Sequence, residues 1–284
     1  MNLRQGYWLW LILVFQGLCA QDNPHVAVHR NEVILGTSIG ITLVCESEEE
    51  GYMLLEEAFA TFRRIENLTS ASIATSEISQ LNSRAGQKPV EVGDEVYQLL
   101  ERALRIAEIT DGAYDPVATP SHSYRELILD PESGKIGLPQ KTMQLEITGI
   151  ARGYGIEQVR NMMRMRQVPG GMINAGGLVG VWGRKASGER WLLGISDPNH
   201  VGQILKWIPL IESSVLLWRP GGSVDQVTVF ASSAELAQCL GLALGVLGPE
   251  QGIPLVELLG DTEAILTDAT GIMYWSRGLD LSLE

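Results

Sequence analysis

Cysteine, histidine and basic residues are all scarce in this 284-residue chain. It has three cysteines and four histidines, with no CxxC pair and no cysteine–histidine spacing typical of a metal site. Acidic residues outnumber lysine and arginine by 34 to 21, which gives a formal net charge of −13. Nucleic-acid binding needs clustered positive charge, so the composition argues against a DNA- or RNA-binding protein.

The N-terminus carries a long apolar run, YWLWLILVF, between a basic start and the small residues before Gln21. This pattern predicts a secretory signal peptide over residues 1–20, cleaved after Ala20, followed by a single domain over 21–284. Lipid attachment at Cys19 and an uncleaved membrane anchor remain open as alternatives. In each case we expect an exported protein, either periplasmic or associated with the outer side of a membrane.

Two cysteines lie beyond this segment, Cys45 and Cys239. An exported protein can join such a pair in one disulfide. Both cysteines stand in apolar stretches, however, which favours two buried free thiols.

The spacing of apolar residues predicts an α+β fold. Helices are expected where apolar side chains recur every three or four residues, over 48–67, 93–110, from just after Leu145, and over 232–247. Ser232 with Glu235 fits a capping box at the start of the last helix. Strands or hairpins are expected over 33–47, 170–183, 191–198, 204–211, 225–231 and around 268–271, and a loop over 69–86. Long helices among antiparallel strands are typical of the α+β class.

The stretch LEITGIARGYGIEQV (145–159) places three glycines and Arg152 just before residues with helical spacing. A glycine turn before a helix can bind phosphate, or it can let a helix pack closely on its neighbour. The spacing GxxxGxG is not an established phosphate fingerprint, so the residues alone favour close packing.

Seven short segments follow one another in an order known from one protein family. They are ILGTSIGITL, SEISQLN, TDGAYDP, GIARGYGIEQV, INAGG, GISDP and VTVFASSAELAQCLGLALGVLG. In this order they resemble the FAD:protein FMN transferases, the ApbE-type flavin transferases. The resemblance runs from about Val33 to the C-terminus and implies that family's fold, with antiparallel sheets packed against long helices.

The resemblance also implies an activity. Family members bind FAD and, with Mg²⁺, transfer its FMN half to a Thr or Ser hydroxyl of a partner flavoprotein, releasing AMP. Partners are often electron-transfer proteins of membranes. For this chain we therefore expect FAD as the cofactor, a flavinylated electron-transfer protein as a partner, and at most peripheral contact with a membrane.

Site residues are carried over from the family by position. The flavin-binding positions are Leu35, Ser72, Glu77, Ala113, Tyr114, Asp115 and Arg152. Arg152 replaces a lysine and keeps the positive charge that a pyrophosphate needs. The metal positions are the backbone carbonyl of Ala151 and Gln238, which replaces the family's aspartate. No catalytic residue is identified.

Several departures from the family pattern put the metal in doubt. Gln238 is neutral, Leu242 replaces a liganding threonine, and Ser72 replaces an aromatic that stacks on the flavin. A histidine-containing loop of the family is also missing before the strand that begins at Gln226. Three interpretations remain: a transferase that uses substitute ligands such as Glu235 or Asp225, a flavin-binding protein without catalysis, and a scaffold whose pocket is filled. An open cavity beside Arg152 would favour the first two.

Overall fold

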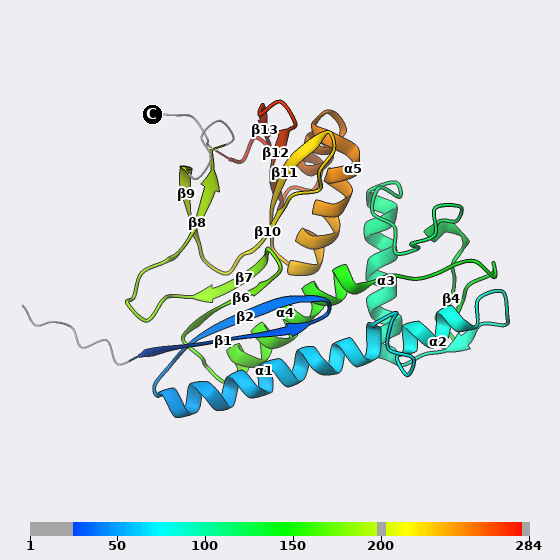
Figure 1. The fold of residues 1–284 in the computed structure, drawn as a ribbon, viewed down its shortest axis with the longest axis horizontal. Coiled ribbons are helices and arrows are strands. Elements are labelled where there is room, and N and C mark those ends of the chain that lie inside the picture. Colours follow the sequence, from blue (N-terminus) through cyan, green and yellow to red (C-terminus); the bar gives the residue numbers. More distant parts are fainter. Residues whose placement is uncertain (1–24, 198–202, 280–284) are drawn as a thin grey trace, which may run out of the picture.

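The computed structural model describes residues 25–197 and 203–279, so the predicted signal segment, Pro198 and His200 lie outside the described residues. Its centre is an eight-stranded antiparallel sheet in the order β1-β2-β6-β7-β10-β11-β12-β13 (Figure 1). The strands are β1 (Val26–Ile34), β2 (Thr37–Cys45), β6 (Gly170–Ala175), β7 (Leu178–Gly183), β10 (Ser214–Trp218), β11 (Val224–Ala231), β12 (Glu263–Asp268) and β13 (Met273–Trp275).

Three long helices cover one face of this sheet, and a separate hairpin covers the other. The helices are α1 (Glu48–Thr69), α4 (Thr148–Met165) and α5 (Ala234–Leu258). The hairpin consists of β8 (Trp191–Ser196) and β9 (Ile204–Leu210). Neighbouring residues of β2 face opposite sides, because Leu43 belongs to the helix-side core while Val44 is buried with Trp191 and Leu210 of the hairpin.

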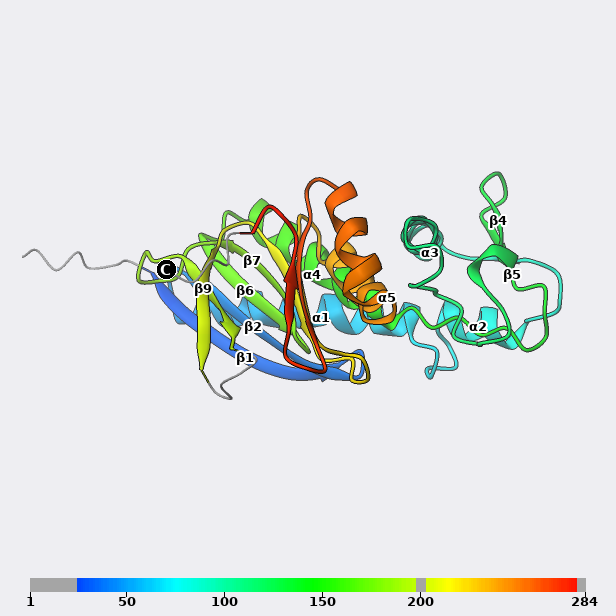
Figure 2. The ribbon, with the colours of Figure 1, turned by 90° about the horizontal axis from the view of Figure 1, so that it is seen from above.

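Smaller elements form the end of the molecule beyond α1 and α4 (Figure 2). They are α2 (Glu77–Ser83), α3 (Asp94–Ile109), a 3₁₀ turn (Tyr124–Glu126) and a three-stranded sheet of β3 (Val90–Glu91), β5 (Lys135–Gly137) and β4 (Ile128–Asp130). Buried side chains of α2 and α3 belong to the same core cluster as those of α1, α4 and α5.

The predicted α+β class is confirmed, and so are the long helices and the hairpin around 268–271. Two local predictions are wrong. The expected loop over 69–86 contains α2, which Ser76 caps by accepting a hydrogen bond from the Ser79 N–H at 3.0 Å. The cap of α5 is Ser233, because its hydroxyl accepts from the Leu236 N–H at 3.1 Å, so Ser232 and Glu235 form no capping box.

Cys45 ends β2 and Cys239 lies within α5, and both are buried free thiols. Among the described helices, α5 is the only one long and apolar enough to span a membrane by length and composition. Side chains of α5 such as Leu240 and Leu244 are buried in the core, which accounts for that apolar composition.

Candidate functional site

A hollow of about 640 Å³ lies where the β1–β2 turn meets the end of α1 and the start of α4. Its lining includes three predicted flavin-binding residues, Leu35, Ser72 and Arg152. Glu66 and Glu146 add two carboxylates to the same lining. We call this space the first hollow.

Arg152 and Glu66 hold the β1–β2 turn from two sides. The Leu35 backbone has a positive φ of 52°, a conformation that side chains rarely adopt. Its carbonyl accepts hydrogen bonds from Arg152 Nε at 3.1 Å and Nη2 at 2.8 Å, while its N–H donates to Glu66 Oε1 at 2.7 Å. Burial lowers the pKa of Arg152 and Glu146 opposes this shift, but an arginine stays charged throughout. The first hollow therefore keeps one fixed cation.

A second hollow of about 320 Å³ adjoins the first, because Glu146 lines both. It contains the predicted residues Ala113, Tyr114 and Asp115. The Asp115 carboxylate accepts hydrogen bonds from the Val117 N–H at 2.8 Å and the Tyr124 N–H at 3.0 Å. Burial raises the pKa of Asp115, although these two donors oppose the shift. Asp115 thus shapes the loop that forms one wall of the hollow.

Tyr114 and Cys239 meet behind the second hollow. The Tyr114 hydroxyl is buried, has no hydrogen-bond partner within the described part of the chain, and lies beside the Cys239 thiol. Burial raises the pKa of both groups, so both stay protonated at neutral pH. Neither group therefore carries a charge at this wall of the second hollow.

The predicted metal position brings together Gln238, Leu242 and Gly149. A Cβ built on Gly149 would lie 3.4 Å from Leu242 Cδ1 and 3.6 Å from Gln238 Cγ, so these two α5 side chains rest against the start of α4. Gln238 is only 6% exposed. Ala151 lies inside α4, where its N–H donates to the Ile147 carbonyl at 2.9 Å, so the predicted glycine turn is the first part of a helix.

This donor set does not fit Mg²⁺, which prefers several oxygen ligands including carboxylates. Across residues 25–197 and 203–279, no three His, Cys, Asp or Glu side chains form a group that could hold a metal ion. The suggested substitutes are occupied elsewhere. Glu235 Oε2 accepts from Arg102 Nε at 2.7 Å, and Asp225 pairs with Arg219 at 3.7 Å.

Comparison with known proteins identifies the family. A family model described as "ApbE family" matches residues 35–124 and 117–216. The chain belongs to the ApbE family.

Relatives within the ApbE family are similar over most of the chain. The FAD:protein FMN transferase of Treponema pallidum is 25% identical across 91% of this chain and 90% of its own length. That of Klebsiella pneumoniae is 28% identical across 61% of this chain and 60% of its own length. Two solved structures share the fold with a TM-score of 0.79, covering 89% of this chain and 98% of theirs: the ApbE protein of Thermotoga maritima at 20% identity and the flavin transferase ApbE of Vibrio cholerae at 18%.

One residue carried over from the ApbE pattern lies outside the hollows. Glu77 is absent from the lining of both, and its Oε2 accepts from the Gly93 N–H at 2.6 Å. Gly93 precedes the first turn of α3, so Glu77 ties α2 to the N-terminus of α3. The flavin-binding role of the other six positions stays a prediction, although the structure gathers all six at the two hollows.

Trp218 lines the second hollow and has no place in the ApbE motifs quoted above. Trp218 ends β10, and residues 219–223 connect β10 to β11 where the resemblance leads us to expect a histidine-containing loop. The sequence offers no signal for the place of Trp218 in the site. It lies in a five-residue strand next to a glycine-rich turn, which is too short for a clear apolar periodicity.

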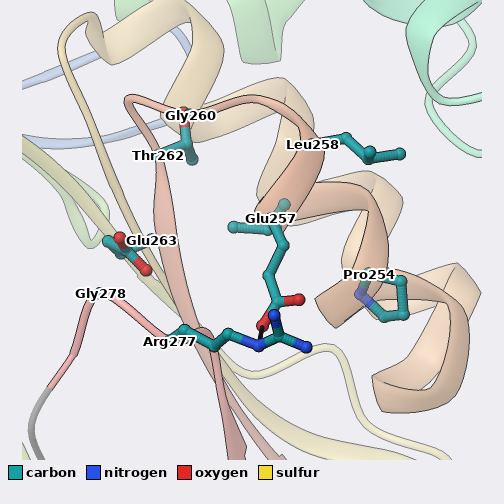
Figure 3. A pocket seen from close by; sticks show the side chains of 9 residues that line it. Pro254, Glu257, Leu258, Gly260, Thr262, Glu263, Arg277 and Gly278 are labelled. Carbon is teal, nitrogen blue, oxygen red and sulfur yellow. Dashed lines mark ion pairs between the residues drawn. The ribbon is translucent and has the colours of Figure 1, made fainter.

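Figure 3 shows a third hollow, of about 560 Å³, near the C-terminal end of α5. Glu257 and Arg277 face each other across it, with Arg277 Nε 3.3 Å from Glu257 Oε1. It contains none of the residues carried over from the ApbE family. The candidate site is therefore the pair of hollows that share Glu146.

Proposed function

We propose that this ApbE-family chain binds FAD in the two adjoining hollows and holds the flavin without transferring it. The observation that carries the proposal is an open space beside Arg152 together with the uncharged contact of Gln238 and Leu242 with Gly149. A pyrophosphate can be bound by one arginine, but breaking it needs further positive charge to neutralise the transition state. FAD is named as the substrate of the relatives, which supports the choice of ligand.

In this proposal the residues of the two hollows bind FAD and take no part in bond breaking. The Arg152 guanidinium neutralises part of the phosphate charge and keeps the β1–β2 turn in place through the Leu35 carbonyl. The backbone of Ala113 to Asp115 forms one wall of the second hollow. Glu146 stands between the hollows, where its negative charge favours ligand groups that donate hydrogen bonds.

The second candidate is FMN transfer itself, with Mg²⁺, to a Thr or Ser of an electron-transfer flavoprotein. The names of the relatives favour it, because the similarity to the Treponema pallidum transferase extends over 91% of the chain. For both candidates we propose action outside the cytoplasm, in the periplasm or on the outer side of a membrane, on the strength of the apolar segment 7–15.

One titration separates the candidates. The purified protein is mixed with FAD, with and without Mg²⁺, while flavin fluorescence and AMP are measured in the same samples. Holding predicts a fluorescence change that needs no Mg²⁺, and no AMP. Mg²⁺-dependent AMP release would overturn the proposal in favour of transfer. No fluorescence change at all would favour the scaffold interpretation.

The variant Arg152→Gln tests where the phosphates bind. We expect FAD binding to weaken about tenfold or more, since a charge-assisted hydrogen bond is worth roughly 1.5–3 kcal/mol. Arg166→Gln is the matched control, because Arg166 caps the other end of α4 and pairs with Glu57. Equal affinities of the two variants would place the phosphates away from Arg152. Urea unfolding of both variants checks that the β1–β2 turn survives.

A further inference from the structure

The β8–β9 hairpin exposes apolar side chains on the face that points away from the sheet. Residues alternate along each strand, so Trp191 and Ile195 are buried with Leu210 against the sheet. The opposite face presents Leu192, which is 51% exposed, and Trp207, which is 59% exposed. Such an unpartnered apolar face on a soluble fold indicates an interaction surface.

The outer face is continuous across the two strands. Gly194 pairs with Trp207, and a Cβ on Gly194 would stand 3.1 Å from the Trp207 ring and 2.9 Å from Ile204 Cδ1. Glycine therefore lets both side chains lie flat over the strand. Leu192 pairs with Pro209, and Ile211, 43% exposed, directly follows the end of β9. We call this set of side chains the hairpin face.

Positive charge gathers beside the hairpin face, although the whole chain is acidic. Arg184, Lys185 and Arg190 precede β8, with Glu189 as the one acid among them. Arg190 is exposed, makes no ion pair within the described residues, and directly precedes β8. A tryptophan and aliphatic side chains beside basic residues are typical of a surface that binds an anionic membrane.

The chain enters the described structure near the hairpin, directly after the N-terminal segment that contains the apolar run. Residues 1–24 precede the described structure and include the apolar run 7–15. The chain enters the sheet at Val26, and Ala27 pairs with Val44, which is buried in the same cluster as Trp191 and Leu210. The start of β1 and the β8–β9 hairpin lie at the same end of the molecule in both views (Figure 1, Figure 2).

We propose that the hairpin face docks on the surface of an anionic lipid bilayer. Trp207, Leu192 and Ile211 enter the headgroup region, and Arg190 with its basic neighbours contacts lipid phosphates. The first hollow begins at Leu35, at the other end of β1. Nine residues of strand span about 30 Å, so the candidate flavin site stays clear of the membrane and open to a soluble partner.

Hydrogen exchange of the full chain tests this docking locally, so that binding through the N-terminal segment does not mask it. The protein is compared in solution, on phosphatidylcholine vesicles and on vesicles that also contain phosphatidylglycerol. We expect the amides of β8 and β9 to exchange more slowly on the anionic vesicles alone. Each basic residue near such a surface contributes roughly a fivefold change in partitioning.

Three variants make the test specific. Trp207→Ser removes the most exposed apolar side chain of the hairpin face, and Arg190→Glu reverses the charge of an exposed side chain. Both should abolish the slowing, whereas Leu258→Ser, which removes an 84% exposed leucine on α5, should retain it. Equal exchange with and without anionic vesicles would overturn the proposal. So would equal slowing on both vesicle types, or slowing that needs a partner protein instead of lipid.

Discussion

Gln238 occupies the position at which the family resemblance implies a metal-binding aspartate. Its side chain is 6% exposed and rests with Leu242 against Gly149, so any ligand at this point meets an amide and an aliphatic group. The adjacent Cys239 thiol is turned toward the Tyr114 hydroxyl and is protonated. Two substitutions would bring back the oxygen ligands that the family resemblance implies.

The double variant Gln238→Asp with Leu242→Thr should make stability depend on Mg²⁺. Without metal, the buried carboxylate costs about 2–4 kcal/mol of unfolding free energy, because nothing in the described residues neutralises it. Mg²⁺ should recover much of this loss by binding the folded state. Thermal unfolding with and without Mg²⁺ measures the effect. Gln98→Asp, on an exposed position of α3, is the control and should show no Mg²⁺ response.

A double variant that ignores Mg²⁺ would contradict this account. It would mean that the start of α4 is not a metal site even when the ligands are supplied. The proposed absence of transfer would then need a cause in other parts of the two hollows.

At the scale of the elements, two of the three glycines of α4 serve close packing. A Cβ on Gly153 would stand 2.6 Å from the Glu235 backbone at the start of α5, and a Cβ on Gly155 would stand 2.4 Å from the Phe62 ring of α1. Gly149 has no such restriction, because its nearest neighbour would be 3.4 Å away. The three glycines therefore divide between two helix contacts and one ordinary position.

Gly153→Ala should destabilise the protein by about 1–3 kcal/mol, because α5 must shift to admit the methyl group. Gly149→Ala places the same methyl group in ordinary contact and should change stability by less than about 1 kcal/mol, as a helical alanine is otherwise favourable. Urea unfolding of the two variants checks the difference. Equal effects would show that the close approach of α4 and α5 is not what Gly153 provides.

At the scale of the whole molecule, the two internal thiols report global unfolding. Cys45 and Cys239 are both buried, on β2 and α5. Burial raises the pKa of Cys45 to about 11 and raises that of Cys239 further, so almost no reactive thiolate exists near pH 8. Neither thiol should react with Ellman's reagent until the sheet and helices separate.

This expectation is measured in a Cys19→Ser chain at pH 8 over a range of urea concentrations. Both thiols should become reactive at one common urea midpoint, the same as that seen by circular dichroism. A thiol that reacts well below that midpoint would reveal local opening of its element.

Much of the fold could be predicted from the sequence, because apolar periods in α1, α3 and α4 continue over several turns. Short elements escaped prediction. The helix α2 has seven residues in a polar stretch, and β10 and the three-stranded sheet are shorter still. Local spacing says little about such elements, since their stability comes from neighbours that are distant in sequence.

The candidate site could be predicted in part, because short motifs locate residues that lie together on one local segment. Six of the positions carried over by motif gather at the two hollows, five of them on turns or loops and Arg152 on α4. Glu77 is used instead at the N-terminus of α3, and Trp218 joins the site from a strand that carries no motif.

By itself, the sequence determined the α+β class, the resemblance to the ApbE family, and the absence of charged metal ligands at Gln238 and Leu242, because these follow from residue types and local order. Only the tertiary structure decided which glycines of α4 serve packing, namely Gly153 and Gly155, and that Arg152 holds the Leu35 carbonyl. It alone also decided that no other part of residues 25–197 and 203–279 covers the hairpin face. Each of these depends on which surfaces meet across long sequence separations, and side-chain periodicity within one segment does not specify such pairings.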